Sequence, residues 1–139
     1  MAATATDETR DLVQRFFEVM NTGNDALIRE FMLRHFADDV EWSVMGTGVP
    51  GAGTMRGRET VMSTIAGVRD LFEPGYPRGT ILRVAADGPL AAVEAEAAGP
   101  MRDGRHYHNR YCFFFQVREG RIQVLHEYFD THYVHELLG

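Results

Sequence analysis

The second half of the chain is dominated by segments that alternate like β-strands, and this feature restricts the fold most. From residue 80 onward four such segments follow one another: "TILRVAA", "AAVEAEAAG", "HYHNRYCFFFQV" and "IQVLHEYFD". Only "DGP", "PMRDGR" and "REGR" separate them, and turn residues at this spacing are typical of hairpins. The sequence therefore predicts a meander of four long antiparallel strands, and such a sheet needs a covering layer on one face.

The covering layer is predicted from the first half, where apolar residues recur at spacings of three and four. This periodicity indicates helices over residues 7–22, 25–36 and 58–72, with Asn24 as the cap of the second helix. A strand is expected over 40–45, a Gly-rich loop over 46–57, and a closing helix over 131–138 that begins from Asp130 or Thr131. We therefore expect a single domain, residues 1–139, of the α+β class, with a curved antiparallel sheet wrapped around the N-terminal helices.

Composition and charge restrict the partners. The 14 Lys and Arg residues against 20 Asp and Glu give a net charge of −6, and no basic cluster offsets it. This balance argues against nucleic acid or an anionic membrane as a partner and favours a small neutral or cationic molecule. The N-terminal "MAATATDETRD" has no signal-peptide features and no apolar run reaches the length of a membrane span, so we expect a cytoplasmic location.

The stretch "AAVEAEAAG" carries two glutamates, Glu94 and Glu96, on one face if it is a strand. Its residues favour a helix, but its short length between two turns favours a strand. If the next turn is centred between residues 103 and 104, Glu96 lies opposite Tyr111 and Glu94 opposite Phe113, on the apolar face that should contact the helices. A shift of one residue would instead place both glutamates on the outer face.

A carboxylate among aromatic side chains must be hydrogen-bonded or have a raised pKa, and a raised pKa suits a general acid or base. Glu127 lies between apolar Leu125 and Phe129 on a neighbouring strand. We therefore predict Glu96 and Glu127 as a base and its protonated partner, with Glu94 beside them. The alternatives are a solvated strand face, or carboxylates at a pocket mouth held by Arg or Lys.

Neutral and aromatic residues complete the predicted site. Asn109 and Tyr111 share the apolar face and could orient a ligand oxygen, or could simply support the glutamates. Trp42 could form a pocket wall or belong to the core. The predicted lining of the ligand site consists of Phe16, Trp42, Asn109, Tyr111, Phe113 and Phe129.

The histidines do not predict a metal site. His106 and His108 alternate on the face expected to lie outside, with His126 on a neighbouring strand, and no acidic cluster completes a ligand set. Cys112 lies on the same face with no activating group beyond Arg110, so a nucleophilic role is not expected. A polar face between subunits is the preferred interpretation, and we expect a homodimer.

Four segments, "VQRFFEVMNTGN", "HFADDVEW", "MRGRETV" and "FFFQVREGRIQVLHEYFDT", resemble the SnoaL-like and ketosteroid-isomerase-like members of the nuclear transport factor 2 superfamily. The resemblance covers nearly the whole chain. It implies a conical, cystatin-like α+β fold with a deep apolar cavity, usually in a dimer. It also implies binding of steroids, polyketides, terpene epoxides or similar molecules, with acid/base chemistry that needs no metal or organic cofactor.

The resemblance also assigns residues. Phe16 occupies the position of the ketosteroid isomerase oxyanion tyrosine and Val44 that of its aspartate base, so steroid isomerisation is not predicted. In limonene epoxide hydrolases the catalytic aspartate corresponds to Glu127, while Glu94 and Glu96 replace an Arg and an Asp. SnoaL-like cyclases use a late-strand acidic residue, for which Glu127 is the nearest candidate.

The resulting prediction is an acid/base enzyme of the isomerase, cyclase or hydrolase type that needs no cofactor. Its substrate would be polyketide-, steroid- or terpene-like. The alternative is a ligand-binding or dimerisation module of the same fold without catalysis.

Overall fold

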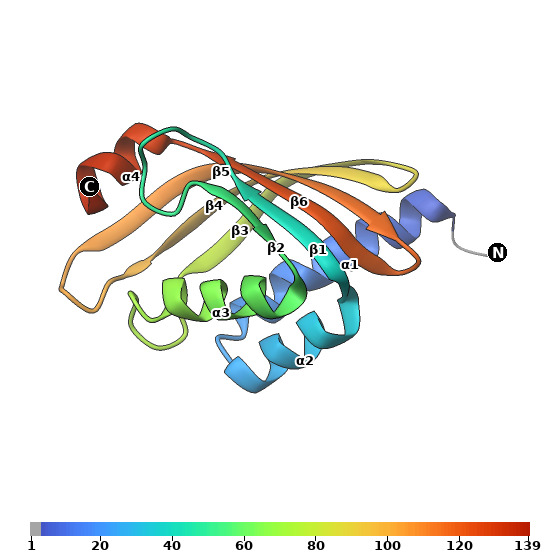
Figure 1. Cartoon of the computed structure of the whole chain (residues 1–139), viewed down its shortest axis with the longest axis horizontal. Helices are drawn as coiled ribbons and strands as arrows, with labels where there is room; N and C mark the ends of the chain where they lie inside the picture. Colours follow the sequence, from blue (N-terminus) through green and yellow to red (C-terminus); the bar gives the residue numbers. More distant parts are fainter. Residues whose placement is uncertain (1–3) are drawn as a thin grey trace.

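Helices cover one face of a strongly curved sheet in the computed structural model, which describes residues 4–139 (Figure 1). Three helices lie under the sheet: α1 (Ala5–Asn21), α2 (Asp25–His35) and α3 (Arg58–Arg69). The fourth, α4 (Thr131–Leu138), lies at one end of the sheet. The strands are β1 (Phe36–Val44), β2 (Gly53–Arg56), β3 (Arg78–Asp87), β4 (Leu90–Pro100), β5 (His106–Arg118) and β6 (Arg121–Phe129).

The six strands form one sheet in the order β2-β1-β6-β5-β4-β3. The predicted α+β class and the meander from β3 to β6 are confirmed. Several details differ from the sequence expectation, among them the start of β1 at Phe36 and not at residue 40. β1 pairs with β6 in parallel, and the Gly-rich loop contains a short strand, β2, that pairs with β1. A strand of four residues is too short to give a clear alternation, which is why the sequence did not reveal it.

Side-chain caps fix where α1, α2 and α4 begin. Asn24 caps α2 by accepting a hydrogen bond from the Leu27 backbone, and Asp130 caps α4 in the same way from Tyr133, as the sequence predicted. α1 begins two residues before its predicted start, because Thr4 and Asp7 form a reciprocal capping box.

The register of the β4–β5 hairpin corrects the sequence expectation by one residue. Glu94 pairs with Cys112 and Glu96 with Arg110, not with Phe113 and Tyr111. The reason is the turn: the Met101 backbone N–H donates to the Arg105 carbonyl at 2.8 Å, so three residues, centred on Asp103, make the connection. An odd number of turn residues moves every side chain of β4 to the opposite face.

The inner face of the sheet and the helices enclose the main core. Phe16 is 3% exposed and packs against several other aromatic rings: Phe17, Phe31, Phe36, Trp42 and Phe115. Phe16 therefore belongs to the core. A second, smaller core lies under α4 and the 46–52 loop, and its buried members are Val49, Phe72, Met101, Tyr107 and Val134.

Candidate functional site

Glu127 is the acidic side chain that the sheet directs inward. It lies on β6 between Val44 of β1 and Phe113 of β5. Its Oε1 accepts a hydrogen bond of 3.0 Å from the indole Nε1 of Trp42. Burial raises the pKa of Glu127 to about 7, although the Trp42 hydrogen bond opposes this shift. Glu127 thus exchanges its proton near neutral pH, as the sequence analysis expected of an enclosed carboxyl.

Aromatic rings surround this carboxyl. Tyr111 and Phe113 stack with ring centroids 5.1 Å apart, and Tyr111 also contacts Phe129 at 5.5 Å. Trp42 is 6% exposed and packs against the aromatic core on its other side. The predicted lining residues other than Phe16 therefore share the inner face with Glu127.

A polar network lies next to the aromatic residues, toward α4. Asn109 is 4% exposed, and its Nδ2 donates to the Tyr107 hydroxyl at 3.1 Å and to the Asp130 carbonyl at 3.2 Å. Its Oδ1 accepts from the backbone N–H groups of Arg110 at 2.8 Å and Asp130 at 3.3 Å. The hydroxyls of Tyr107 and Tyr111 are hydrogen-bonded to each other.

Burial raises the pKa of both tyrosines of this network, so both hydroxyls keep their protons at neutral pH. The negative charge of Glu127 adds to the shift for each. Tyr107 was not among the predicted site residues. The signal for it was its position two residues before Asn109, on the same face of the strand.

Glu94 and Glu96 are not part of this arrangement. The three-residue turn places both on the outer face, where Glu94 pairs with Arg83 at 3.3 Å. Glu96 lies 3.3 Å from His108 Nε2 and 3.5 Å from Arg110 Nε. The predicted proton-sharing pair of Glu96 and Glu127 is therefore wrong, since the two carboxyls lie on opposite faces of the sheet.

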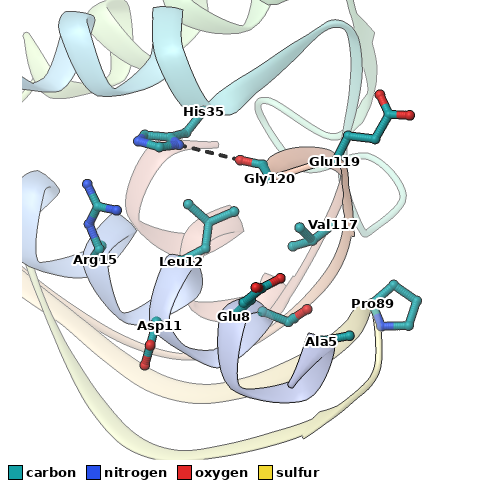
Figure 2. Close-up of a pocket in the computed structure, with 11 residues that line it drawn as sticks. Ala5, Glu8, Asp11, Leu12, Arg15, His35, Pro89, Val117, Glu119 and Gly120 are labelled. Carbon is teal, nitrogen blue, oxygen red and sulfur yellow. Dashed lines mark hydrogen bonds between the residues drawn. The ribbon is translucent and has the colours of Figure 1, made fainter. Parts of the chain in front are cut away.

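Two surface clefts, each of about 540 Å³, lie away from Glu127. One is formed by the start of α1, the end of α2 and the turns after β3 and β5 (Figure 2). There His35 Nδ1 lies 3.4 Å from the Gly120 carbonyl. Burial and three nearby arginines lower the pKa of His35, and the contact with Gly120 opposes this shift. The second is lined mainly by charged residues around Arg58 and Arg118. Neither cleft is the deep apolar cavity that the resemblance implied.

Residues 4–139 contain no group of three or more His, Cys, Asp or Glu side chains placed to hold a metal ion. No helix among them is long and apolar enough to cross a membrane.

Comparison with known proteins agrees with the fold. The SnoaL-like domain family matches residues 13–125, which is most of the chain. The chain belongs to the SnoaL-like family. No curated protein matches the SnoaL-like chain by sequence.

Several solved structures share the fold of this SnoaL-like domain. A putative SnoaL-like polyketide cyclase from Jannaschia Sp. CCS1 has a TM-score of 0.82 and 14% identity, covering 96% of this chain and 93% of its own. An NTF2-like protein from Burkholderia xenovorans LB400 has a TM-score of 0.77 and 23% identity, covering 99% and 100%. TerC, co-crystallised with polyporic acid, has a TM-score of 0.77 and 20% identity, covering 94% and 97%. At these identities the similarity establishes the NTF2-like fold.

Proposed function

We propose that this SnoaL-like domain binds an apolar small molecule and moves a proton on it with Glu127. The observation that carries the proposal is a single carboxyl in an aromatic environment, with its pKa raised to about 7 by burial. An ordinary surface glutamate is almost fully ionised at neutral pH, whereas Glu127 is present in both forms. It can therefore accept a proton in one step and return it in the next without a second acid.

Trp42 supports this role of Glu127. Its indole N–H holds Oε1 of the carboxyl, which leaves Oε2 as the oxygen for proton transfer. The stacked rings of Tyr111 and Phe113 offer a flat apolar surface next to the carboxyl. These features favour a planar, largely apolar substrate with an acidic C–H or O–H group.

The names of two structural neighbours point to the same chemical class. One is a putative polyketide cyclase, and another was co-crystallised with polyporic acid. We therefore propose a polyketide-like aromatic or enolisable compound as the substrate, acted on by acid/base chemistry of the cyclase or isomerase type. The second candidate is binding of such a compound without turnover. The burial of Glu127 favours this second candidate, because a carboxyl that is partly neutral can donate a hydrogen bond to a bound oxygen without transferring its proton.

A thermal-shift screen of the wild-type protein and Glu127→Gln separates these candidates. Enones, lactones, epoxides and polyketide-like phenols are the compounds to test, because ligands of the folded state raise its melting temperature. Hits are then assayed for turnover by mass spectrometry. Turnover by the wild type and none by Glu127→Gln supports the acid/base role, while full turnover by Glu127→Gln refutes it. Equal binding by both proteins with no turnover supports the binding module.

We also propose a homodimer through the outer face of β4, β5 and β6. This face presents Phe114 and Tyr128 between charged groups, and Tyr128 is 46% exposed. The ion pair of Glu96 with Arg110 places both signs of charge beside this patch. Light scattering measures the oligomeric state, and the Tyr128→Arg variant should be a monomer. A wild-type protein that is monomeric at all concentrations would refute the proposal.

A further inference from the structure

Asn109 holds a position in which every hydrogen-bonding group of its amide is used. Two backbone N–H groups, from Arg110 and Asp130, point at its Oδ1. These donors fix which end of the amide is oxygen, since the nitrogen end could not accept from them. The Nδ2 group must therefore donate to the Asp130 carbonyl and to the Tyr107 hydroxyl.

The orientation of the Asn109 amide determines the direction of the hydrogen bond between Tyr107 and Tyr111. The Tyr107 oxygen accepts from Asn109, so its own hydrogen needs an acceptor elsewhere. Among the side chains and backbone of residues 4–139, the acceptor in contact with that hydroxyl is the Tyr111 oxygen. If Tyr107 accepted from Tyr111 as well, the hydrogen of the more enclosed hydroxyl would have no acceptor, since Tyr107 is 6% exposed and Tyr111 is more exposed. We therefore infer that Tyr107 donates to Tyr111. The Tyr111 hydrogen cannot point back along the same line, because two hydrogens would then lie between the two oxygens.

The hydrogen of the Tyr111 hydroxyl is thus left without an acceptor in the described part of the chain. Burial raises the pKa of Tyr111, so the hydroxyl keeps this hydrogen at neutral pH. The hydroxyl is part-buried, so an oxygen atom of a ligand can accept this hydrogen and complete its hydrogen bonding. Its oxygen also accepts from Tyr107, and hydrogen bonds in a chain polarise one another, so Tyr111 becomes the stronger donor. The free hydrogen lies on the residue that stacks on Phe113, the cross-strand neighbour of Glu127.

We propose that Asn109 is a positioning residue, which orients the Tyr107–Tyr111 hydrogen bond so that the Tyr111 hydroxyl is presented to an oxygen atom of the bound molecule. The part that concerns the ligand rests on the proposed function, whereas the direction of the hydrogen bonds does not. Asn109 also bonds both backbone groups of Asp130, the cap of α4. Asn109 therefore contributes both to the attachment of α4 and to the orientation of the donor.

Asn109→Asp is the variant that tests the direction. The carboxylate keeps the acceptor for the Arg110 and Asp130 N–H groups but can donate neither to Tyr107 nor to the Asp130 carbonyl. Tyr107 then donates to the new carboxylate and accepts from Tyr111, so the chain of hydrogen bonds reverses. Tyr111 changes from an acceptor within the pair into a donor within it, and no hydrogen is left for a ligand.

The readout is NMR of protein labelled with carbon-13 at the tyrosine Cζ, measured above neutral pH. The chain has five tyrosines, so Tyr107→Phe and Tyr111→Phe assign the two signals. We expect Asn109→Asp to move the Tyr111 signal toward the phenolate position. Tyr133→Phe is the matched control, because it removes two contacts of α4, from the His108 N–H and to the His106 carbonyl, without touching Asn109.

An unchanged Tyr111 signal in Asn109→Asp, or the same movement in Tyr133→Phe, would overturn the proposed direction of the hydrogen bonds.

A second experiment measures the binding of polyporic acid by titration. Tyr111→Phe and Asn109→Asp should each weaken binding about tenfold, the loss of one hydrogen bond. If the wild type does not bind polyporic acid, this ligand class is wrong for the proposed function, while the NMR result still decides the direction. Binding that is equal in all three proteins would overturn the role of Tyr111 as the donor.

Discussion

Glutamate side chains have opposite environments on the two faces of the sheet. Glu127 on the inner face is enclosed by aromatic rings and has a pKa raised by burial to about 7. Glu96 on the outer face is held by His108 and Arg110 in contact with solvent. Both residues lie in alternating strand sequences and both have apolar neighbours in the chain. The difference shows that the face of the sheet, set by the register, decides whether a glutamate is enclosed with a raised pKa or exposed in an ion pair.

The largest contrast between the faces should come from two adjacent phenylalanines of β5. Phe115 is fully buried on the inner face, whereas Phe114 lies on the outer face beside His126. Phe115→Ala leaves a cavity in the core and should lower the free energy of unfolding by about 3–5 kcal/mol. Phe114→Ala should lower it by less than about 1 kcal/mol. Urea denaturation measures both, and equal losses would mean that the assignment of the two faces is wrong.

The next contrast is the pH dependence of stability. The pKa of Glu127 is higher in the folded protein than in the unfolded chain, where it is the ordinary value of 4.5. Its stabilising contribution is therefore complete below about pH 4.5 and is lost as the pH rises through about 7. The difference between these pKa values corresponds to about 3 kcal/mol. Glu127→Gln should remove this component of the pH dependence.

Glu96→Gln is the control for this measurement. Its carboxyl is on the outer face, so the variant should keep the decline in stability between pH 5 and pH 8 that belongs to Glu127, roughly the window of the raised pKa. Unfolding in urea at a series of pH values compares the three proteins. A wild-type curve that is flat across this range would contradict the burial of Glu127.

A smaller effect is expected from removing the outer ion pairs. Glu96→Ala should cost at most about 1 kcal/mol, because the carboxylate and its partners are solvated in both states. The effect should shrink as salt is added. Thermal unfolding at low and high ionic strength measures it, with Glu94→Ala as the matched variant for the pair with Arg83. A loss of several kcal/mol that does not depend on salt would mean that Glu96 is buried.

The smallest effect is spectroscopic. Trp42 is the only tryptophan of the chain, and its indole N–H donates to Glu127. Ionisation of that carboxyl changes the field at the indole, so tryptophan fluorescence should titrate with a midpoint near the pKa of about 7. The change should vanish in Glu127→Gln and persist in Glu96→Gln. Persistence of the transition in Glu127→Gln would assign it to another group.

The sequence was sufficient for most of the fold because the periodicity of each segment is strong. The caps at Asn24 and Asp130 and the inner face of β5 were all predicted from local patterns. The β4–β5 register was not, because a turn of two or three residues changes the face of Glu94 and Glu96 while the letters of "PMRDGR" suit either. Local sequence determines which face is apolar but does not determine the length of a turn.

The site was predicted in part for a related reason. Glu127 was identified from its own apolar neighbours in the strand, which the register of another hairpin does not alter. Its hydrogen bond with Trp42 joins residues 85 positions apart and depends on the parallel pairing of β1 with β6. That pairing leaves no local pattern in the sequence. Asn109 was predicted as a site residue, but its hydrogen bonds to Asp130 were hidden, since they depend on where the chain turns into α4.

The strand order has a consequence for how the chain acquires its site. β6 comes after every other strand in the sequence, yet it lies in the middle of the sheet between β1 and β5. Until β6 is in place, the β1–β2 hairpin and the β3–β5 meander are separate pieces, each with an open edge. During synthesis on the ribosome, Trp42 therefore has no hydrogen bond to Glu127 until β6, the last strand, has been made. The enclosed carboxyl and the joining of the two halves of the sheet are therefore completed in the same step, so a partly made chain lacks the hydrogen bond between Trp42 and Glu127.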